Sequence, residues 1–282
     1  MRDIRRRIRT ARNIQQITKA LQMVAAARLQ RAQYRAAAAR PYTQEMRATV
    51  GHLAFVGREI SHPLLEQREV VNVGVILITS ERGMAGSYNA NVIRTTLDLV
   101  SSYSPSNVKL ITVGRKGRVF FARRGYNIVA EFPMPSSEVT FADARDVART
   151  ARSMFESREV DTVFMVYTKF LSAVSHKVTT LQLLPIIPPE QEKTVNLEEY
   201  IFEPAPAELL ASLLPRYVDN QVYSAMLEAL ASEHGARMSA MRAATDNAGE
   251  MIERLTLDFN RARQAAITKE IAEIVSGAEA LK

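Results

Sequence analysis

Cysteine is absent from this chain of 282 residues, and that absence removes several classes of site. The chain can hold no disulfide framework, no thiolate metal site and no cysteine nucleophile. Long hydrophobic runs are also missing, because no stretch approaches the roughly 18 apolar residues that a helix needs to cross a bilayer. The first residues lack the apolar segment of a secretory signal. We therefore expect a chain that neither spans a membrane by itself nor depends on disulfide bonds.

Acidic residues are scarce at the start of the chain. Residues 1–40 contain eleven basic side chains and one acidic side chain, Asp3. The whole chain carries a formal net charge of +7, which favours an acidic partner. An arginine-rich, acid-poor amphipathic start also resembles a mitochondrial transit peptide. The same helical pattern continues for dozens of residues, however, and this continuity favours retained structure.

The N-terminal segment is predicted to be one long helix. Alanine and arginine, both strong helix formers, dominate it, and no proline or glycine occurs before Pro41. We expect Pro41 to bend the helix and Gly51 or Gly57 to end it. Its apolar stripe comprises Ile4, Ile8, Ala11, Ile14, Ile17, Leu21, Ala25, Leu29, Ala32, Ala36 and Ala39. Because this stripe is narrow and rich in alanine, it suits close packing on another helix.

The middle of the chain changes from a helical period to short apolar runs. These runs are Val73–Thr79, Val108–Val113, Asn127–Phe132 and Thr162–Tyr167, and helical patterns near 89–103, 115–124 and 141–157 lie between them. Strands that alternate with helices predict a parallel sheet built from βαβ units. Lys177–Leu184 follows the preceding strand too closely for a crossover, so we expect an antiparallel hairpin at the sheet edge. A passage with Pro185, Pro188, Pro189, Pro204 and Pro206 is expected to close this domain.

The C-terminal segment is again helical in pattern. An unbroken helix from Pro215 to the end would reach roughly 100 Å at 1.5 Å per residue. Its stripe comprises Tyr223, Leu227, Leu230, His234, Met238, Met241, Thr245, Ala248, Ile252, Leu255, Phe259, Ala262 and Ala266. The two terminal stripes can bury each other if the helices pair antiparallel. The predicted fold is therefore α/β: an antiparallel coiled coil of the terminal helices (1–57 and 206–282) with an inserted Rossmann-like α/β domain at 70–205.

Catalytic and ligand-binding motifs are weak in this sequence. Gly114–Gly117 follows a strand and opens a helix, but it lacks the spacing and the hydroxyl of a P-loop. Ser80–Gly86 also follows a strand, without the pattern of a dinucleotide fingerprint. The four histidines show no ligand spacing, and a position in the helix seam is expected for His234. Asp143 and Asp146 share one predicted helix, where a solvated face is the more common role.

Two other functions stay open on the residues alone. A basic coiled-coil adaptor could bind nucleic acid, although the N-terminal helix has no aromatic residue before Tyr34 and no known nucleic-acid motif. An α/β enzyme could use the loop at Gly83–Gly86. A basic amphipathic helix could also lie on an anionic membrane, but its alanine-rich face would insert weakly.

Three passages carry a family resemblance. They are Ile14–Leu29 (IQQITKALQMVAAARL), Ser80–Asn89 (SERGMAGSYN) and Asn260–Glu270 (NRARQAAITKE), the last continuing to Gly277–Leu281 (GAEAL). They resemble the gamma subunit family of F-type ATP synthases. The last passage is similar to the family signature, which joins Thr268, Glu270, Glu273, Gly277 and Ala278 at fixed spacing. Because the passages lie near both ends and in the middle, the resemblance covers the whole chain.

The resemblance implies a central-stalk rotor subunit of a proton-translocating ATP synthase. Members of the family transmit rotation between the membrane c-ring and the alpha/beta catalytic hexamer, and they help to regulate ATPase activity and proton flow. The implied partners are the alpha and beta subunits, the epsilon subunit and the c-ring. Nucleic acid is not among the expected partners, and neither a cofactor, a metal nor a catalytic residue of the chain's own is expected. The implied location is the cytoplasmic side of the cell membrane, peripherally and through the complex.

The resemblance also implies contact residues. Arg237, Arg263, Gln264 and Thr268 match positions where the family's coiled coil contacts beta-subunit loops, and Arg82, Gly83, Gly86 and Asn89 match a loop beside it. Ile271–Lys282 has few charges and suits a tip that turns in an apolar sleeve. Relatives commonly carry Asp at the position of Glu81 and Cys at that of Ala85, and chloroplast members carry a regulatory insert with cysteines. Its absence argues against thiol control, and the length and start of the chain favour a bacterial member.

Overall fold

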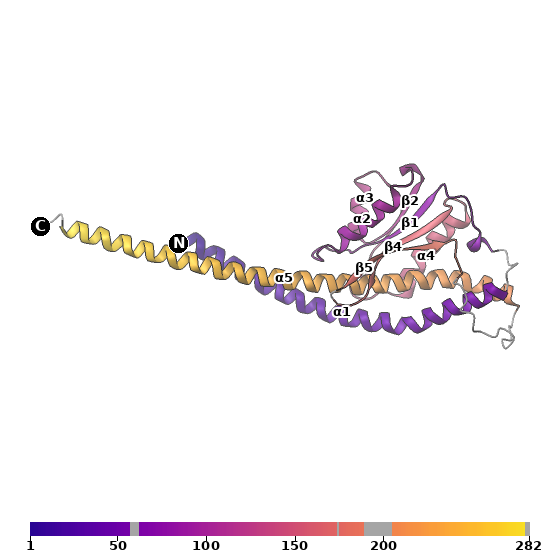
Figure 1. Cartoon of the computed structure of the whole chain (residues 1–282), viewed down its shortest axis with the longest axis horizontal. Coiled ribbons are helices and arrows are strands. Elements are labelled where there is room, and N and C mark those ends of the chain that lie inside the picture. Colours follow the sequence, from indigo (N-terminus) through magenta and orange to yellow (C-terminus); the bar gives the residue numbers. More distant parts are fainter. Residues whose placement is uncertain (57–61, 174, 189–204, 280–282) are drawn as a thin grey trace. The chain divides into compact units, whose positions relative to one another are not determined.

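The computed structural model describes residues 1–56, 62–173, 175–188 and 205–279. Its contacts divide the chain into two compact units, one of residues 1–25 with 237–282 and one of residues 26–236. Two long helices contribute to both units, α1 (Arg2–Val56) and α5 (Pro206–Glu279). The elements are labelled in Figure 1. Within the described residues, no helix has the length and apolar character of a membrane span.

The first unit is an antiparallel pair of helices, as predicted. The Oγ1 atoms of Thr18 and Thr245 are 2.7 Å apart, and the guanidinium of Arg5 lies 5.4 Å from the ring centroid of Phe259. As the residue number rises on α1, it falls by a similar amount on α5, and this relation defines the antiparallel direction. Ala11, Ala25 and Ala248 are buried in the unit, so small side chains let the two helices approach closely.

The second unit contains a five-stranded sheet of strand order β3-β2-β1-β4-β5. Its strands are β1 (Val73–Ile78), β2 (Val108–Val113), β3 (Asn127–Phe132), β4 (Thr162–Phe170) and β5 (His176–Leu184). The first four are parallel, and β5 pairs antiparallel with β4 as a hairpin, as predicted. The crossover helices are α2 (Tyr88–Val100), α3 (Arg115–Ala122) and α4 (Phe141–Glu156).

The sheet core explains why these runs form strands. All six residues of β1 are buried, as expected for a central parallel strand covered on both faces. Val73, Val75 and Leu77 pack in one cluster with residues of α2, including Val92. The edge strand β3 alternates between exposed and half-buried residues. The pattern of buried apolar residues, and not a sequence motif, therefore determines this part of the fold.

The structure corrects two details of the predicted long helices. Helix α1 continues through Pro41 and past Gly51 to Val56, which excludes Gly51 as its end, and Gly57 lies outside the described residues. Helix α5 begins at Pro206, where the C-terminal segment was predicted to begin, so Pro206 opens the helix instead of closing the preceding domain. Proline is well tolerated at the first helical position, because its missing N–H would have no partner there. Pro189 and Pro204 lie outside the described residues.

Tertiary packing accounts for the uninterrupted helices. Leu210, Leu214 and Val218 are fully buried at a spacing of four residues around Pro215. Met46, Val50 and Leu53 continue the buried stripe of α1 beyond Pro41. A proline in a helix interior costs about 3 kcal/mol. Burial of several large apolar side chains contributes more than that, at about 1.5–3 kcal/mol each.

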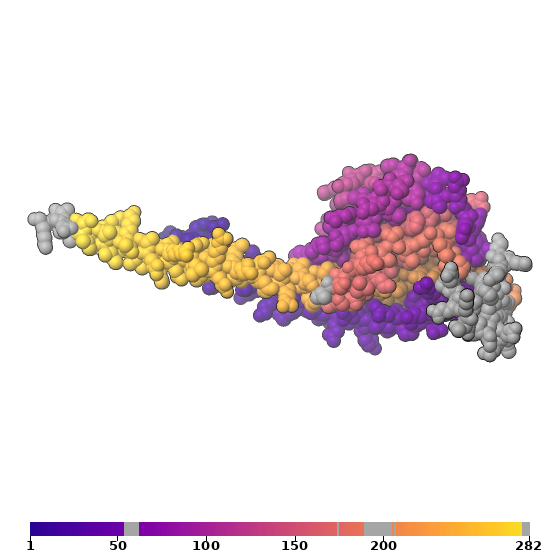
Figure 2. Space-filling model, in the orientation of Figure 1, coloured from indigo at the N-terminus to yellow at the C-terminus, as the bar shows by residue number. Residues whose placement is uncertain are grey.

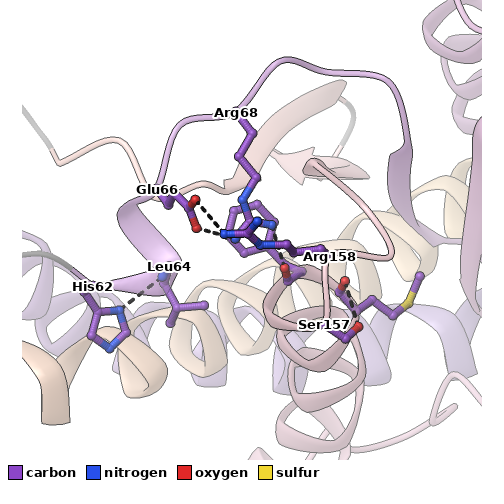
Figure 3. A network of polar contacts seen from close by, with 8 residues as sticks. His62, Leu64, Glu66, Arg68, Ser157 and Arg158 are labelled. Atoms are coloured by element: carbon purple, nitrogen blue, oxygen red, sulfur yellow. Dashed lines mark hydrogen bonds and ion pairs between the residues drawn. The ribbon is translucent and has the colours of Figure 1, made fainter.

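The connection that precedes β1 is anchored to the end of α4 (Figure 3). A short 3₁₀ turn, η1 (Pro63–Leu65), starts it, and the backbone N–H of Leu64 donates to Nδ1 of His62. The guanidinium of Arg68 donates to the Phe155 carbonyl at 2.9 Å, lies 4.5 Å from the Phe155 ring centroid and pairs with Glu66 at 2.6 Å. Arg68 thus satisfies a carbonyl at the C-terminus of α4 and holds the connection in place.

Candidate functional site

The loop between β1 and α2 is the first candidate site, and Asn89 organises it. The backbone N–H of Ser80 donates to Oδ1 of Asn89 at 3.0 Å, and Nδ2 of Asn89 donates to Oγ of Ser80 at 2.8 Å. The hydroxyl of Ser80 donates to the carbonyl of Arg82. The side chain of Arg82 is exposed. Asn89 therefore shapes the loop from inside, and Arg82 is presented on the surface.

The two candidate glycines in this loop differ in their roles. Gly86 has a φ of 55°, in the left-handed region that glycine adopts without strain, and Met84 has a φ of 63°. A Cβ on Gly83 would meet only the end of the Lys116 side chain, at 3.6 Å, which is an ordinary contact. Gly86 therefore adopts this turn without strain, whereas steric space does not explain Gly83.

The Gly114–Gly117 turn lies between a strand and a helix, where a P-loop would bind a nucleotide phosphate. The first N–H groups of α3 are already occupied by protein acceptors. Arg115 N–H donates to Oε2 of Glu81 at 3.2 Å, Lys116 N–H to the Ser80 carbonyl at 3.2 Å and Gly117 N–H to Oγ1 of Thr79 at 2.9 Å. A helix N-terminus binds anions through such N–H groups. Since Glu81, Ser80 and Thr79 take them, this turn is structural.

A cavity of about 290 Å³ lies at the carboxyl ends of β2 and β3, beside the same turn. Its lining includes Arg115 and Arg118, but also the carboxylates of Glu81 and Glu131. Arg118 pairs with Glu131 at 3.3 Å. These carboxylates disfavour a phosphate by charge repulsion. The cavity lies where α/β folds place ligands, but its charge pattern argues against a nucleotide.

The other candidate groups have structural roles in the described residues. Asp143 forms a capping box with Thr140 at the start of α4, and Asp146 pairs with Arg149 on the same helix. His234 is 1% exposed in the interior of the second unit. Among the described residues, no cluster of three potential metal ligands occurs.

The second group of candidate residues lies on α5 in the first unit. Arg263, Gln264 and Thr268 are exposed and Arg237 is half-buried. Gln264 and Thr268 are four residues apart and share a helix face, while Arg263 points about 100° away. Arg237 lies roughly 40 Å along the helix axis from Arg263. The structure thus brings together Arg263, Gln264 and Thr268, but not Arg237.

The end of α5 has no helix beside it in the first unit. Figure 2 shows the yellow end of α5 continuing past the indigo start of α1. All residues from 267 to 277 are exposed, including Ile267 at 48%, Ile271 at 57% and Ile274 at 70%. These three share one helix face by their spacing of four and three residues. An apolar face of this kind is typical of a protein–protein contact.

We expect Asn89→Ala to destabilise the second unit. The substitution removes the acceptor of the Ser80 N–H, and Ser80 is fully buried. An unsatisfied buried donor costs about 1–3 kcal/mol, so the thermal midpoint should fall. Asn91→Ala is the matched control, because Asn91 lies on the same helix and its side-chain bond to Ser87 is exposed. Equal midpoints for the two variants would contradict the role assigned to Asn89.

Thr79 was not among the predicted site residues, and no role was predicted for Glu81. Each acts through a partner more than thirty residues away, since Thr79 and Glu81 meet the turn at 114–117. One signal was present: both lie within three residues after the buried strand β1, where polar residues of α/β folds converge.

Comparisons with known proteins cover the entire chain. A family model described as ATP synthase matches residues 1–281. The ATP synthase gamma chain of Desulfitobacterium hafniense is 50% identical over 281 residues, covering 100% of this chain and 99% of the relative. The gamma chain of Heliobacterium modesticaldum is 47% identical over 289 residues, with coverage of 100% and 99%.

Solved structures of ATP synthases also contain chains that resemble this one. The central stalk and c-ring structure of the Tetrahymena thermophila mitochondrial ATP synthase has a chain with a TM-score of 0.63 and 25% identity, covering 81% of this chain and 99% of that one. A chain of the Euglena gracilis mitochondrial ATP synthase has a TM-score of 0.71 at 17% identity, covering 99% and 94%, and supports the fold alone.

The fold and the candidate sites define a class of protein: a long antiparallel coiled coil with an inserted α/β domain, carrying its candidate residues on a loop and on an exposed helix. The chain belongs to the ATP synthase gamma chain family, and the resemblance predicted from its three motifs is confirmed. It is accordingly a subunit of the ATP synthase complex.

Proposed function

We propose that this chain is the central-stalk rotor subunit of a proton-translocating F-type ATP synthase. It transmits rotation between the membrane c-ring and the alpha/beta hexamer, contacts the epsilon subunit, and helps to regulate ATPase activity and proton flow. It binds at the cytoplasmic side of the cell membrane through the complex. The observation that carries this proposal is the antiparallel helix pair of the first unit, fixed by Thr18 with Thr245, in a chain that matches the gamma family throughout.

The exposed end of α5 supports a turning contact. Ile271, Ile274 and Val275 are all more than half exposed, and few charged residues interrupt this stretch. Apolar contacts have no directional preference, so a helix end can change its angular position in an apolar sleeve without breaking specific bonds. A persistent salt bridge would instead hold one angle. This end therefore suits the tip of a rotating shaft.

Contact residues are proposed on the same helix. Arg263, Gln264 and Thr268 present hydrogen-bonding side chains to solvent, and Arg237 lies farther along α5. A hydrogen bond to a charged group contributes about 1.5–3 kcal/mol. Bonds of that strength can hold the shaft at a dwell angle and still release it. We assign these four residues to contacts with beta-subunit loops.

The loop before α2 is proposed as a second coupling region. Arg82 is its exposed charged side chain, while Asn89 and Gly86 hold the loop in shape. Gly83 has no steric requirement for glycine, which is compatible with close approach of a partner chain. Arg82, Gly83, Gly86 and Asn89 thus form one proposed contact region on the α/β domain.

The functional division of the chain is proposed to follow residues 1–57, 70–205 and 206–282. The first and third segments form the shaft, and the second is the α/β domain. The chain is proposed to have no catalytic site of its own. At the first turn of α3, protein acceptors occupy the N–H groups of Arg115, Lys116 and Gly117, which disfavours a phosphate site at that turn.

The decisive experiment is assembly. The purified chain should hydrolyse no ATP by itself, and it should co-purify in a fixed ratio with alpha and beta subunits. Saturating nucleotide should leave its thermal midpoint unchanged, because a ligand stabilises only a protein that binds it. Failure to assemble with alpha and beta subunits would overturn the rotor assignment. A nucleotide-dependent rise in the midpoint would favour the enzyme alternative, and steeply salt-dependent duplex binding would favour the nucleic-acid adaptor.

A further inference from the structure

The part of α5 inside the second unit carries several buried polar residues. Asp219 is 6% exposed, Asn220 is 2% exposed and Ser232 is fully buried. Buried polar groups need partners, because an unpaired one costs free energy. The partners of these polar residues lie on three different elements, and they show which parts of the unit α5 contacts.

Asp219 holds the α/β domain through α4. Its Oδ1 accepts a hydrogen bond from Arg152 at 3.0 Å, and the two side chains are only 9% and 18% exposed. Burial raises the pKa of Asp219, and the guanidinium of Arg152 opposes that rise, with smaller contributions from Arg145 and Arg149. Among the described residues, Nε of Arg152 has no hydrogen-bond partner. The carboxylate of Asp219 therefore offsets the cost of burying the Arg152 guanidinium.

Asn220, the next residue, holds α1. Its Nδ2 donates to Oγ1 of Thr43 at 3.1 Å. Two further contacts bind α5 to the α/β domain: the hydroxyl of Tyr88 donates to the Ala229 carbonyl at 3.2 Å, and Oγ of Ser232 donates to the Thr168 carbonyl at 3.1 Å. Two consecutive residues of α5 thus contact α4 on one side and α1 on the other.

Polar contacts of this kind fix position more than they add stability. A buried ion pair contributes little net free energy compared with an apolar pair of the same shape. Its value is geometric, as a single buried polar residue sets the register of a coiled coil. The buried stripe of α1 in this unit includes Ala32 and Ala36 as well as the larger Met46 and Val50. The polar contacts add specific partners to this apolar packing.

We propose that Asp219 and Arg152, together with Asn220, are positioning residues that hold the α/β domain at one fixed angle on α5, so that torque applied to this domain reaches the shaft through α5. The proposal rests on the rotor function proposed above. Helix α1 meets the α/β domain through exposed polar contacts, Arg28 with the Ser136 carbonyl at 3.3 Å and Arg35 with Glu138 at 2.7 Å. Exposed pairs contribute little, which favours α5 as the helix that carries the load.

The test compares stability with coupling in the assembled, membrane-bound enzyme. Asp219→Asn removes the charge that compensates Arg152 and should lower the thermal midpoint of the chain. The double variant Arg152→Leu with Asp219→Leu removes both charges and should restore the midpoint. If the pair positions the domain, both variants should lose ATP-driven proton pumping while ATP hydrolysis is retained. Asp219→Glu, which keeps the ion pair, should recover pumping.

Two comparisons make the outcome decisive. Asp146→Asn is the matched control, because Asp146 pairs with Arg149 on the same helix but at the surface, and it should behave as wild type. A double Leu variant that regains both stability and full pumping would overturn the proposal, since the pair would then be merely structural. If the wild-type chain itself fails to restore pumping to a gamma-deficient complex, the rotor function fails instead.

Discussion

Gly114→Ala is expected to prevent the α/β domain from folding stably. Gly114 has a φ of 91°, and a Cβ at this position would lie 2.2 Å from the Thr79 carbonyl oxygen. The carbonyl oxygen belongs to the backbone of Thr79, and the Cβ would be bonded directly to the Cα of residue 114, so the overlap can be relieved only by separating β1 from the start of α3. We expect a loss of at least about 4 kcal/mol, the range reached when strain and overlap combine. Thermal unfolding should show a midpoint about 10 °C lower or more.

Gly125→Ala is the control that separates the two causes. Gly125 has a φ of 76°, but a Cβ there would have no atom within 4 Å. This variant carries the conformational strain alone, about 1–2 kcal/mol. If the two variants lose the same stability, backbone strain explains both, and the close approach of Thr79 contributes nothing. A larger loss for Gly114→Ala confirms that the turn before α3 is fixed by backbone contact.

Arg263→Ala is expected to impair the assembled enzyme without unfolding the chain. Arg263 is exposed on α5, so its removal leaves no cavity and no buried partner. A charged hydrogen bond of about 1.5–3 kcal/mol corresponds to a change of roughly tenfold to a hundredfold in the rate of a step that depends on it. ATP synthesis and rotational torque of reconstituted complexes should therefore fall, while the thermal midpoint of the isolated chain stays the same.

Arg261→Ala provides the matched control for this position. Arg261 is also exposed on α5, about 200° around the helix from Arg263. A specific contact should be lost with Arg263 and kept with Arg261. Equal decreases in both variants would indicate a general effect of positive charge. Unchanged torque and synthesis in Arg263→Ala would remove this residue from the mechanism.

The separate stability and coupling measurements address different parts of the molecule. Gly114 and Asn89 test the local structure of the α/β domain, whereas Arg263 tests a surface that only the complex uses. The pair of Asp219 and Arg152 lies between these cases, because it is buried and is proposed to act on coupling. The two readouts therefore distinguish residues that hold the fold from residues that transmit rotation.

Local patterns of apolar residues in the sequence predicted most of the fold. Strands β2 and β3 lie at the predicted residues, because a buried strand needs a short apolar run that the sequence shows directly. The hairpin of β4 and β5 followed from the short connection between them. The family followed from three motifs, and the whole-chain comparisons confirm it.

Only the tertiary structure decided the helix ends and the contacts between distant residues. Pro41, Gly51 and Pro215 are local signals for interruption, yet α1 and α5 continue through them because burial of neighbouring apolar residues outweighs the local cost. The contacts of Glu81 with Arg115 and of Asp219 with Arg152 join residues far apart in the chain. Periodicity places a side chain on a face of its own element, but it carries no information about the partner that the folded chain brings to that face.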